Sequence, residues 1–171
     1  MRALYHGAMP PPPVASVDTP TAIGVLIVDD QLAVREGLKR LIAAAPIALR
    51  FVSTASTGYE ALSAAARLRP DVVILDVDLA GEDGLSLVAK FPPGTNILVL
   101  TSHGDSVTRE RAKLLGARTF IEKHQPAADL LSAIAEIYAA RQRGDKPPGT
   151  PGANSHREMA ASSDARKHFG H

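Results

Sequence analysis

The stretch "VVILDVDLAGEDG", from Val72 to Gly84, decides how the chain folds. Four apolar residues run directly into Asp76, and Asp78 follows two places later. A short, continuous apolar run is typical of a strand that is covered on both faces, as in a parallel sheet. Buried charge is costly unless it is paired, so a buried strand that ends in carboxylates indicates that this edge binds a positively charged group.

Strand and helix patterns alternate five times between residues 23 and 143. Apolar runs predict strands, while apolar residues spaced three or four apart predict helices with one buried face. Thr57 and Glu60 have capping-box spacing at a helix start. Gly116 suits the position after a helix end, and Pro126 suits a first helical turn. The predicted strands are 23–30, 48–56, 71–76, 95–102 and 117–123, and the predicted helices are 31–46, 57–68, a short one from about 83, 105–116 and 126–143.

Five consecutive strand–helix pairs predict an α/β fold with one parallel sheet and helices on both faces. Crossovers between parallel strands are nearly always right-handed, which leaves few other arrangements. Residues 48–56 alternate between apolar and polar and therefore predict an edge strand. Sheets of this kind bind ligands at the carboxyl ends of the strands, near the point where the strand order reverses.

The composition of the whole chain of 171 residues excludes several classes of protein. The 19 Lys and Arg against 18 Asp and Glu leave a net charge of +1, which predicts no basic surface for nucleic acid or anionic membrane. There is no cysteine for disulfides or thiolate sites, and no apolar run reaches the roughly 18 residues of a membrane span. We expect a soluble, cytoplasmic protein with one domain at 23–143, a flexible Pro-rich extension at 1–22 and a disordered tail at 144–171.

Residues of complementary chemistry end four of the five predicted strands. Acids end the first and third, hydroxyls end the fourth, and a lysine ends the fifth. Parallel strands bring all of these ends to one edge of the sheet. The residues are Asp29, Asp30, Asp76, Thr101, Ser102 and Lys123.

Converging carboxylates predict a cation site at this edge. They would repel one another and raise their own pKa values unless a cation joined them. A site of oxygen ligands with room for water suits Mg²⁺, with Mn²⁺ as an alternative. Asp76, beside the cation, the amine of Lys123 and the hydroxyl of Thr101, is placed to attack phosphorus and form an aspartyl phosphate. Asp29 or Asp30 also suits the N-cap of the next helix.

The order of these residues resembles the receiver domain of two-component response regulators, over residues 23–143. "VLIVDDQ" (25–31) resembles its acidic strand, and "VVILDVDLAGEDGLSLV" (72–88) resembles its phosphoacceptor strand and loop. "ILVLTS" (97–102) and "FIEK" (120–123) resemble its hydroxyl and lysine strands. The resemblance implies a flavodoxin-like, doubly wound (βα)5 fold whose five parallel strands lie in the order 2-1-3-4-5.

By position, the resemblance implies that Asp76 is the phosphoacceptor. It implies that Asp29 and Asp30 bind Mg²⁺ together with Asp76, one of the pair directly and the other through water. The backbone carbonyl of Asp78 would complete the metal site, and Lys123 would contact the phosphoryl group.

The resemblance also implies residues that transmit or time the signal. Thr101 would contact the phosphoryl group and act as a switch together with Phe120. Phe120 lacks the hydroxyl of tyrosine, so its switching would rest on packing. Asp78 and His103, two residues after Asp76 and Thr101, occupy positions that tune the lifetime of the phosphoryl group in this family.

Two residues depart from the family's pattern. Ala80 stands where the loop often has proline, which we expect to loosen the loop slightly. His124 follows the lysine where many members have proline after a cis bond. A cis bond before any other residue costs about 2.5–4 kcal/mol, so we expect a trans bond or visible strain there.

The resemblance implies a phosphorylatable signalling protein. A histidine kinase or histidine phosphotransfer protein would donate the phosphoryl group to Asp76. We expect no enzymatic activity beyond self-phosphorylation from small donors and autodephosphorylation. The segment after Arg143 is too short and too polar for a helix-turn-helix domain, so we expect a stand-alone receiver that acts through protein partners. It would bind neither DNA nor membrane, and phosphorylation could drive homodimer formation.

Two other interpretations compete with this one. A degenerate receiver would serve as a binding module without phosphorylation, although the full residue set argues against it. The stretch "LDVDLAG" (75–81) also resembles the nucleophile motif of haloacid-dehalogenase-type phosphatases. In those enzymes the nucleophile strand comes first and the acidic pair last, whereas here Asp29 and Asp30 precede Asp76. The chain order therefore argues against the phosphatase.

Overall fold

The computed structural model describes residues 22–145. Apart from their innermost residues, the predicted extensions at 1–22 and 144–171 lie outside the described residues and stay predictions. The main strands are β1 (Ile23–Val28), β2 (Leu49–Ala55), β3 (Val72–Asp76), β6 (Asn96–Thr101) and β7 (Thr119–Glu122). The helices are α1 (Leu32–Ala43), α2 (Gly58–Leu68), the 3₁₀ helix η1 (Gly84–Lys90), α3 (Ser106–Leu114) and α4 (Ala127–Gln142). A short hairpin consists of β4 (Asp78–Leu79) and β5 (Glu82–Asp83).

The five main strands form one sheet in the order β2-β1-β3-β6-β7, and each neighbouring pair is parallel. This is the predicted flavodoxin-like order 2-1-3-4-5 when only the main strands are counted. The strand with alternating polarity, β2, lies at an edge as predicted. The order reverses between β1 and β3, so the acids that follow these two strands lie at the position where such sheets bind ligands.

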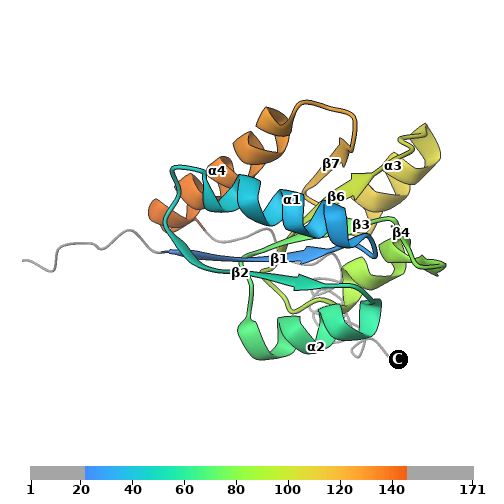
Figure 1. Cartoon of the computed structure of the whole chain (residues 1–171), viewed down its shortest axis with the longest axis horizontal. Coiled ribbons are helices and arrows are strands. Elements are labelled where there is room, and N and C mark those ends of the chain that lie inside the picture. The colour runs from blue at the N-terminus through green and yellow to red at the C-terminus, as the bar shows by residue number, and fades with distance from the viewer. Residues whose placement is uncertain (1–21, 146–171) are drawn as a thin grey trace, which may run out of the picture.

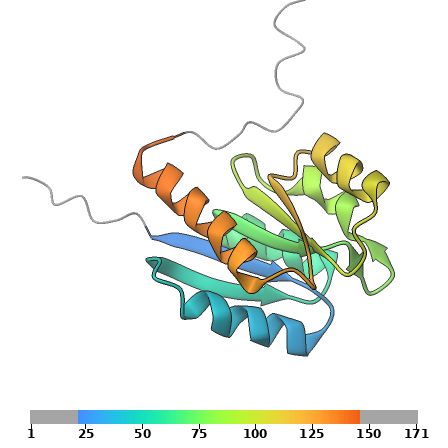
Figure 2. The same ribbon diagram turned by 90° about the horizontal axis from the view of Figure 1, so that it is seen from above.

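The sheet separates two hydrophobic cores. Figure 1 shows α1 and α4 on one side of the sheet and α2 on the other, and Figure 2 shows α4 (orange) crossing in front of the strands. Alternate residues of β1 face opposite sides, with Leu26 and Val28 on the α2 side and Val25 and Ile27 on the α4 side. Because both faces are covered, the strands are apolar almost throughout, as their sequences predicted.

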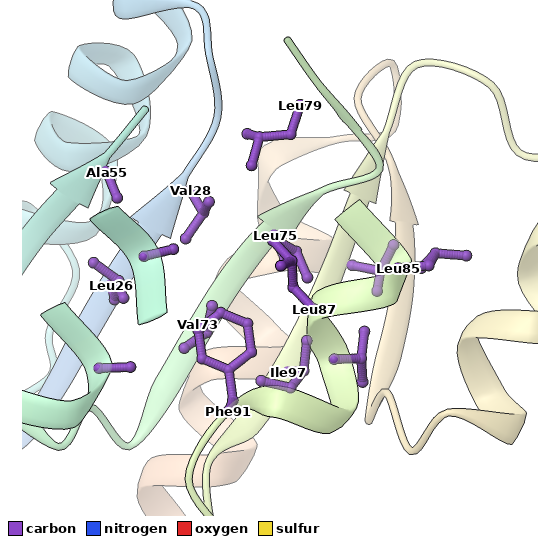
Figure 3. Packing of buried hydrophobic residues seen from close by; sticks show 14 of the residues in the cluster. Leu26, Val28, Ala55, Val73, Leu75, Leu79, Leu85, Leu87, Phe91 and Ile97 are labelled. Carbon is purple, nitrogen blue, oxygen red and sulfur yellow. The ribbon is translucent and has the colours of Figure 1, made fainter. Parts of the chain in front are cut away.

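The α2-side core joins the sheet to α2, η1 and α3. Figure 3 shows Leu75 of β3 beside Leu87 of η1, with Leu26 of β1 further along the same core. The α4-side core joins the sheet to α1 and α4, and it contains Ile42 and Ile134. Leu26, Ile42, Leu75 and Ile134 have no measurable exposed surface, so both cores are closed to water.

Helix ends follow the sequence with two corrections. Thr57 accepts a hydrogen bond from the Glu60 backbone N–H (3.2 Å), but the Glu60 carboxylate accepts the N–H of Ser56 (2.8 Å) and not that of Thr57. The predicted capping box is therefore only half formed. Gly116 has a φ of 94° just after α3, as predicted for a residue beyond a helix end. Pro126 occupies the N-cap position of α4, one residue before the first turn.

The loop after Asp76 differs most from the prediction. It contains the β4–β5 hairpin, in which Asp78 pairs with Asp83 and Leu79 with Glu82. The two turn residues, Ala80 and Gly81, have φ values of 49° and 85°. Two-residue hairpins favour such positive φ values because they match the twist of the strands. Proline cannot adopt them, so Ala80 occupies a turn that proline could not form, and the expected slight loosening of the loop stays a prediction.

The peptide bond before His124 is trans, because residues 22–145 contain no cis peptide bond. This agrees with the first of the two outcomes expected there. Within the same residues, no helix is both long and apolar enough to cross a bilayer.

Gly37→Ala should stabilise the protein by about 0.5–1 kcal/mol. Gly37 lies inside α1, where an added Cβ would meet nothing within 4 Å and the backbone has no positive φ. Alanine loses less backbone entropy than glycine when the helix forms. Urea denaturation of the wild type and the variant measures the change, and a lower midpoint for the variant would contradict the reason given.

Candidate functional site

The carboxyl ends of four strands meet at one edge of the sheet, where Asp76 lines a cavity. Asp29 follows β1, Asp76 ends β3, Thr101 ends β6 and Lys123 follows β7. The cavity has a volume of about 560 Å³. Its lining includes Asp30, Asp76, Asp78, Glu82, Ser102 and His103.

Lys123 joins the two buried carboxylates. Its Nζ donates to Oδ2 of Asp76 at 2.7 Å and to Oδ2 of Asp29 at 2.8 Å. The side chains of both acids are only 2% exposed, whereas that of Lys123 is 17% exposed. The two acids are 47 residues apart in the chain and share one ammonium group, so the sheet topology alone brings them together. Removing Lys123 would leave two buried carboxylates uncompensated, whereas removing one acid would leave Lys123 paired with the other.

Burial and pairing act in opposite directions on these groups. Burial raises the pKa of Asp76 above its ordinary value, although the hydrogen bond and charge of Lys123 work against the rise. Burial lowers the pKa of Lys123, but hydrogen bonds with Asp29 and Asp76 outweigh it, so the net pKa is raised. Lys123 is therefore charged at neutral pH, and the ionised form of Asp76 is disfavoured by its surroundings.

Metal-free Asp76→Asn should have a higher melting temperature than the wild type at pH 7. A raised pKa means that the folded protein disfavours the ionised carboxylate, so ionised Asp76 lowers stability above its usual titration range. The difference should shrink as the pH falls through the pKa of Asp76, because the wild-type carboxyl then becomes neutral as well. Calorimetric scans in chelator at several pH values test this, and a less stable variant at pH 7 would contradict it.

Asp29 is held at each of its polar atoms. Its N–H donates to the carbonyl of Ala55 (3.2 Å), and its Oδ1 accepts the N–H of Gln31 (2.8 Å). Its other carboxylate oxygen accepts from Lys123, and its carbonyl accepts from Arg35 (2.7 Å). The N-cap of α1 is Gln31, so neither Asp29 nor Asp30 takes the N-cap position considered from the sequence.

Asp29, Asp30 and Asp76 fit a divalent cation. Each offers one carboxylate oxygen, and these three oxygens lie within 4.8 Å of one another. Asp30 is exposed while the other two are buried, which leaves one side of the group open to water. Mg²⁺ prefers oxygen ligands and keeps several waters, so both the donor atoms and the open side suit it.

Thr101 is buried, and its hydroxyl interacts with its own loop. It donates to the carbonyl of His103 (3.1 Å) and accepts the backbone N–H of the same residue (3.2 Å). The sequence placed Thr101 at this edge, and the structure places it there. In this structure its hydroxyl holds the β6–α3 loop rather than Asp76.

Phe120 is half-buried against the α2-side core. The guanidinium of Arg109, on α3, lies 4.7 Å from the centre of its ring. The same arginine pairs with Glu122 at 3.0 Å. Sequence reasoning missed Arg109, because nothing in the spacing of an exposed helical arginine marks a contact with a later strand.

Gly84 allows the loop to pass very close to the backbone carbonyl of Asp76. A Cβ at Gly84 would lie closer to the carbonyl oxygen of Asp76 than any real Cβ contact, and 2.9 Å from that of Val77. The Gly84 N–H donates to the carbonyl of Val77 (2.8 Å). Asp83 caps η1 by accepting the N–H of Leu85 (3.1 Å) and also pairs with Arg111. The loop is thus fixed on both sides of the close approach.

The family model and the related proteins point to the same family. Residues 25–135 match the family model of the response regulator receiver domain. "Transcriptional regulatory protein LnrK" of Bacillus subtilis is 32% identical over 120 residues, which cover 68% of this chain and 54% of that protein. "Protein-glutamate methylesterase/protein-glutamine glutaminase 2" of Anaeromyxobacter dehalogenans is 39% identical over 110 residues, covering 63% of this chain and 32% of that protein.

Solved structures agree with the family model. A crystal structure of a LuxR-family two-component response regulator from Aurantimonas sp. SI85-9A1 has a TM-score of 0.63 and 29% identity, covering 70% of this chain and 87% of that one. The chain spans about half the length of the first curated relative and about a third of the second. The similarity therefore concerns the receiver part of those proteins.

Proposed function

Because the chain belongs to the response regulator receiver domain family, we propose that it accepts a phosphoryl group on Asp76 from a histidine kinase or a histidine phosphotransfer protein. The observation that carries the proposal is the ammonium group of Lys123, which bridges Asp76 and Asp29 at the edge of an open, acid-lined cavity. Receiver domains act mostly in signalling. We propose the same for this chain, without enzymatic activity beyond gaining phosphate from small donors and losing it again.

In the proposed transfer, a carboxylate oxygen of Asp76 attacks the phosphorus of a phosphohistidine in line with the leaving nitrogen. A phosphorus–oxygen bond forms as the phosphorus–nitrogen bond breaks, and the electron pair of the broken bond stays on the histidine nitrogen. Lys123 orients Asp76 before transfer and holds a phosphoryl oxygen afterwards. Thr101 turns its hydroxyl from the carbonyl of His103 to another phosphoryl oxygen.

Asp29, Asp30 and Asp76 would hold the divalent cation, with the backbone carbonyl of Asp78 as a further ligand. The bound cation supplies positive charge that offsets the negative charge gathering around the phosphoryl group. Mg²⁺ is the proposed ion and Mn²⁺ an alternative, because both accept oxygen ligands.

Thr101 and Phe120 form the proposed switch. When Thr101 turns toward the phosphoryl group, it releases the loop that carries His103 and leads to α3. Arg109 of α3 lies over Phe120, so movement of α3 changes the packing of that ring. The cation–π contact thus supplies a specific interaction for an aromatic residue that has no hydroxyl.

Asp78 and His103 both line the cavity, which supports the proposal that they tune the lifetime of the phosphoryl group. A water that attacks the phosphorus must enter through this lining. The carboxylate of Asp78 and the imidazole of His103 are therefore placed to admit, orient or block it.

The first test is incubation with a small phosphodonor, with Mg²⁺ or with chelator, followed by intact mass measurement. One phosphoryl group should be added with Mg²⁺ and none with chelator. A chain that stays unmodified with Mg²⁺ should then be mixed with a phosphorylated histidine kinase. Failure of both donors would favour the degenerate receiver, a binding module that works without phosphorylation.

Thr101→Ala and Lys123→Ala should keep labelling on Asp76 but weaken the response to it. Each removes a contact to the phosphoryl group while leaving the nucleophile in place. Hydrogen exchange in α3 and β7, with and without phosphodonor, measures the response. Ser102→Ala is the matched control, because it removes the neighbouring hydroxyl and should respond as the wild type does. An unchanged response in Thr101→Ala would remove Thr101 from the switch.

Partners and location complete the proposal. We propose that the phosphorylated form binds protein partners, including a second copy of itself, through the receiver domain and without contacting DNA directly. The cytoplasm, typical of the family, is the proposed location. The order of the strands, with the acidic pair before the nucleophile, does not support a haloacid-dehalogenase-type phosphatase.

A further inference from the structure

Arg35 reaches back from α1 to the peptide that links the two N-terminal acids. Its Nη1 donates to the backbone carbonyl oxygen of Asp29 at 2.7 Å. This carbonyl belongs to the peptide unit between Asp29 and Asp30, at the point where the chain leaves β1. Arg35 is itself half-buried, so its guanidinium is held close to the protein surface.

The bond from Arg35 is the fourth hydrogen bond that holds Asp29, and it acts on the backbone carbonyl. The N–H and the two carboxylate oxygens of Asp29 are held by Ala55, Gln31 and Lys123. The bond between Oδ1 of Asp29 and the Gln31 N–H already limits rotation about the Cα–C bond of Asp29, because that rotation moves Gln31 relative to the Asp29 side chain. The bond from Arg35 adds a second constraint on the same rotation, at the carbonyl itself, and so helps to set the direction in which Asp30 leaves the strand.

The charge of Arg35 also acts on an acid of a neighbouring helix. Glu60, on α2, has its pKa lowered mainly by hydrogen bonds with Ser56 and also by the positive charge of Arg35.

We propose that Arg35 is a positioning residue for the cation site, which orients the exposed Asp30 carboxylate by fixing the Asp29–Asp30 peptide. The inference rests on the proposed function, since it presumes that Asp29, Asp30 and Asp76 bind Mg²⁺. Groups that hold metal ligands in place from outside typically contribute about 10–100-fold to metal affinity. A simple charge argument gives the opposite sign, because a guanidinium near Mg²⁺ repels it.

Calorimetric titration of Mg²⁺ into the full chain separates these two effects. Arg35→Ala should weaken Mg²⁺ binding by about 10-fold or more. Arg35→Lys, which retains the charge and one donor, should recover part of the loss. Arg40→Ala is the matched control, because it removes an exposed arginine from the last turn of the same helix and should bind within about twofold of the wild type.

Binding of Arg35→Ala at or above the wild-type affinity would overturn the inference while leaving the proposed function intact. A wild type that binds no Mg²⁺ would overturn the cation site and the inference with it. Melting temperatures in chelator show whether each variant is folded. If Arg35→Ala is unfolded, Arg35→Gln takes its place, with a shorter neutral side chain and the same expected weakening.

Discussion

Asp76→Asn should gain no phosphoryl group under conditions that label the wild type completely. The asparagine amide is a poor nucleophile, and its nitrogen cannot form a stable acyl phosphate. The neighbouring acids cannot replace it. Asp29 is buried, and both of its carboxylate oxygens already accept hydrogen bonds. Asp30 is exposed and, unlike Asp76, is not bonded to Lys123. The expected effect is the loss of all measurable adduct.

The measurement is intact mass after incubation with a small phosphodonor and Mg²⁺, with peptide mapping of the wild-type adduct. Asp78→Asn is the matched control, because it makes the same substitution two residues away in the same cavity. It should remain labelled, with a changed lifetime of the adduct. Equal labelling of Asp76→Asn and the wild type would place the acceptor at another residue and overturn the proposed function.

Gly84→Ala should destabilise the fold by about 3 kcal/mol or more. The new methyl group would overlap the backbone oxygen of Asp76 and crowd that of Val77. Backbone atoms cannot rotate away as a flexible side chain can. The loop would have to detach from Asp76 or η1 would have to shift, and η1 carries the buried residues Leu85 and Leu87.

Urea denaturation measures this loss, and Gly37→Ala provides the control. Both variants add one methyl group to a glycine, but the methyl group at Gly37 meets open space and should stabilise α1. Opposite signs for the two substitutions would show that the close approach to Asp76, and not loss of glycine itself, causes the effect. A Gly84→Ala protein as stable as the wild type would contradict the packing described around Asp76.

The sheet and the gathering of the acids were predictable because both depend on short-range patterns. Apolar runs such as "VVIL" (72–75) identify buried strands, and the parallel topology then carries Asp29, Asp76 and Lys123 to one edge. This prediction requires no information about side-chain geometry. The position of each group follows from the strand that it ends.

The contacts that refine the site were not predictable in the same way. The β4–β5 hairpin depends on Ala80 taking a positive φ, which alanine rarely does outside a favourable turn. The Glu60 carboxylate accepts a hydrogen bond from the backbone N–H of Ser56 and not from that of Thr57. The two N–H groups are adjacent in the chain, so residue spacing alone cannot predict which of them is bound. Arg35 and Arg109 have long side chains whose partners depend on the path of the surrounding backbone.

The two cores on either side of the sheet have a consequence for how such a protein diverges. Phe120 contacts the α2-side core, while its neighbour Ile121 belongs to the α4-side core, and the layer of strands lies between them. Substitutions at sites that share no contacts usually have additive effects on stability. A duplicated copy of this gene could therefore acquire a new partner along α1 and α4 by repacking one core, and inherit the arrangement of Phe120 and α3 unaltered.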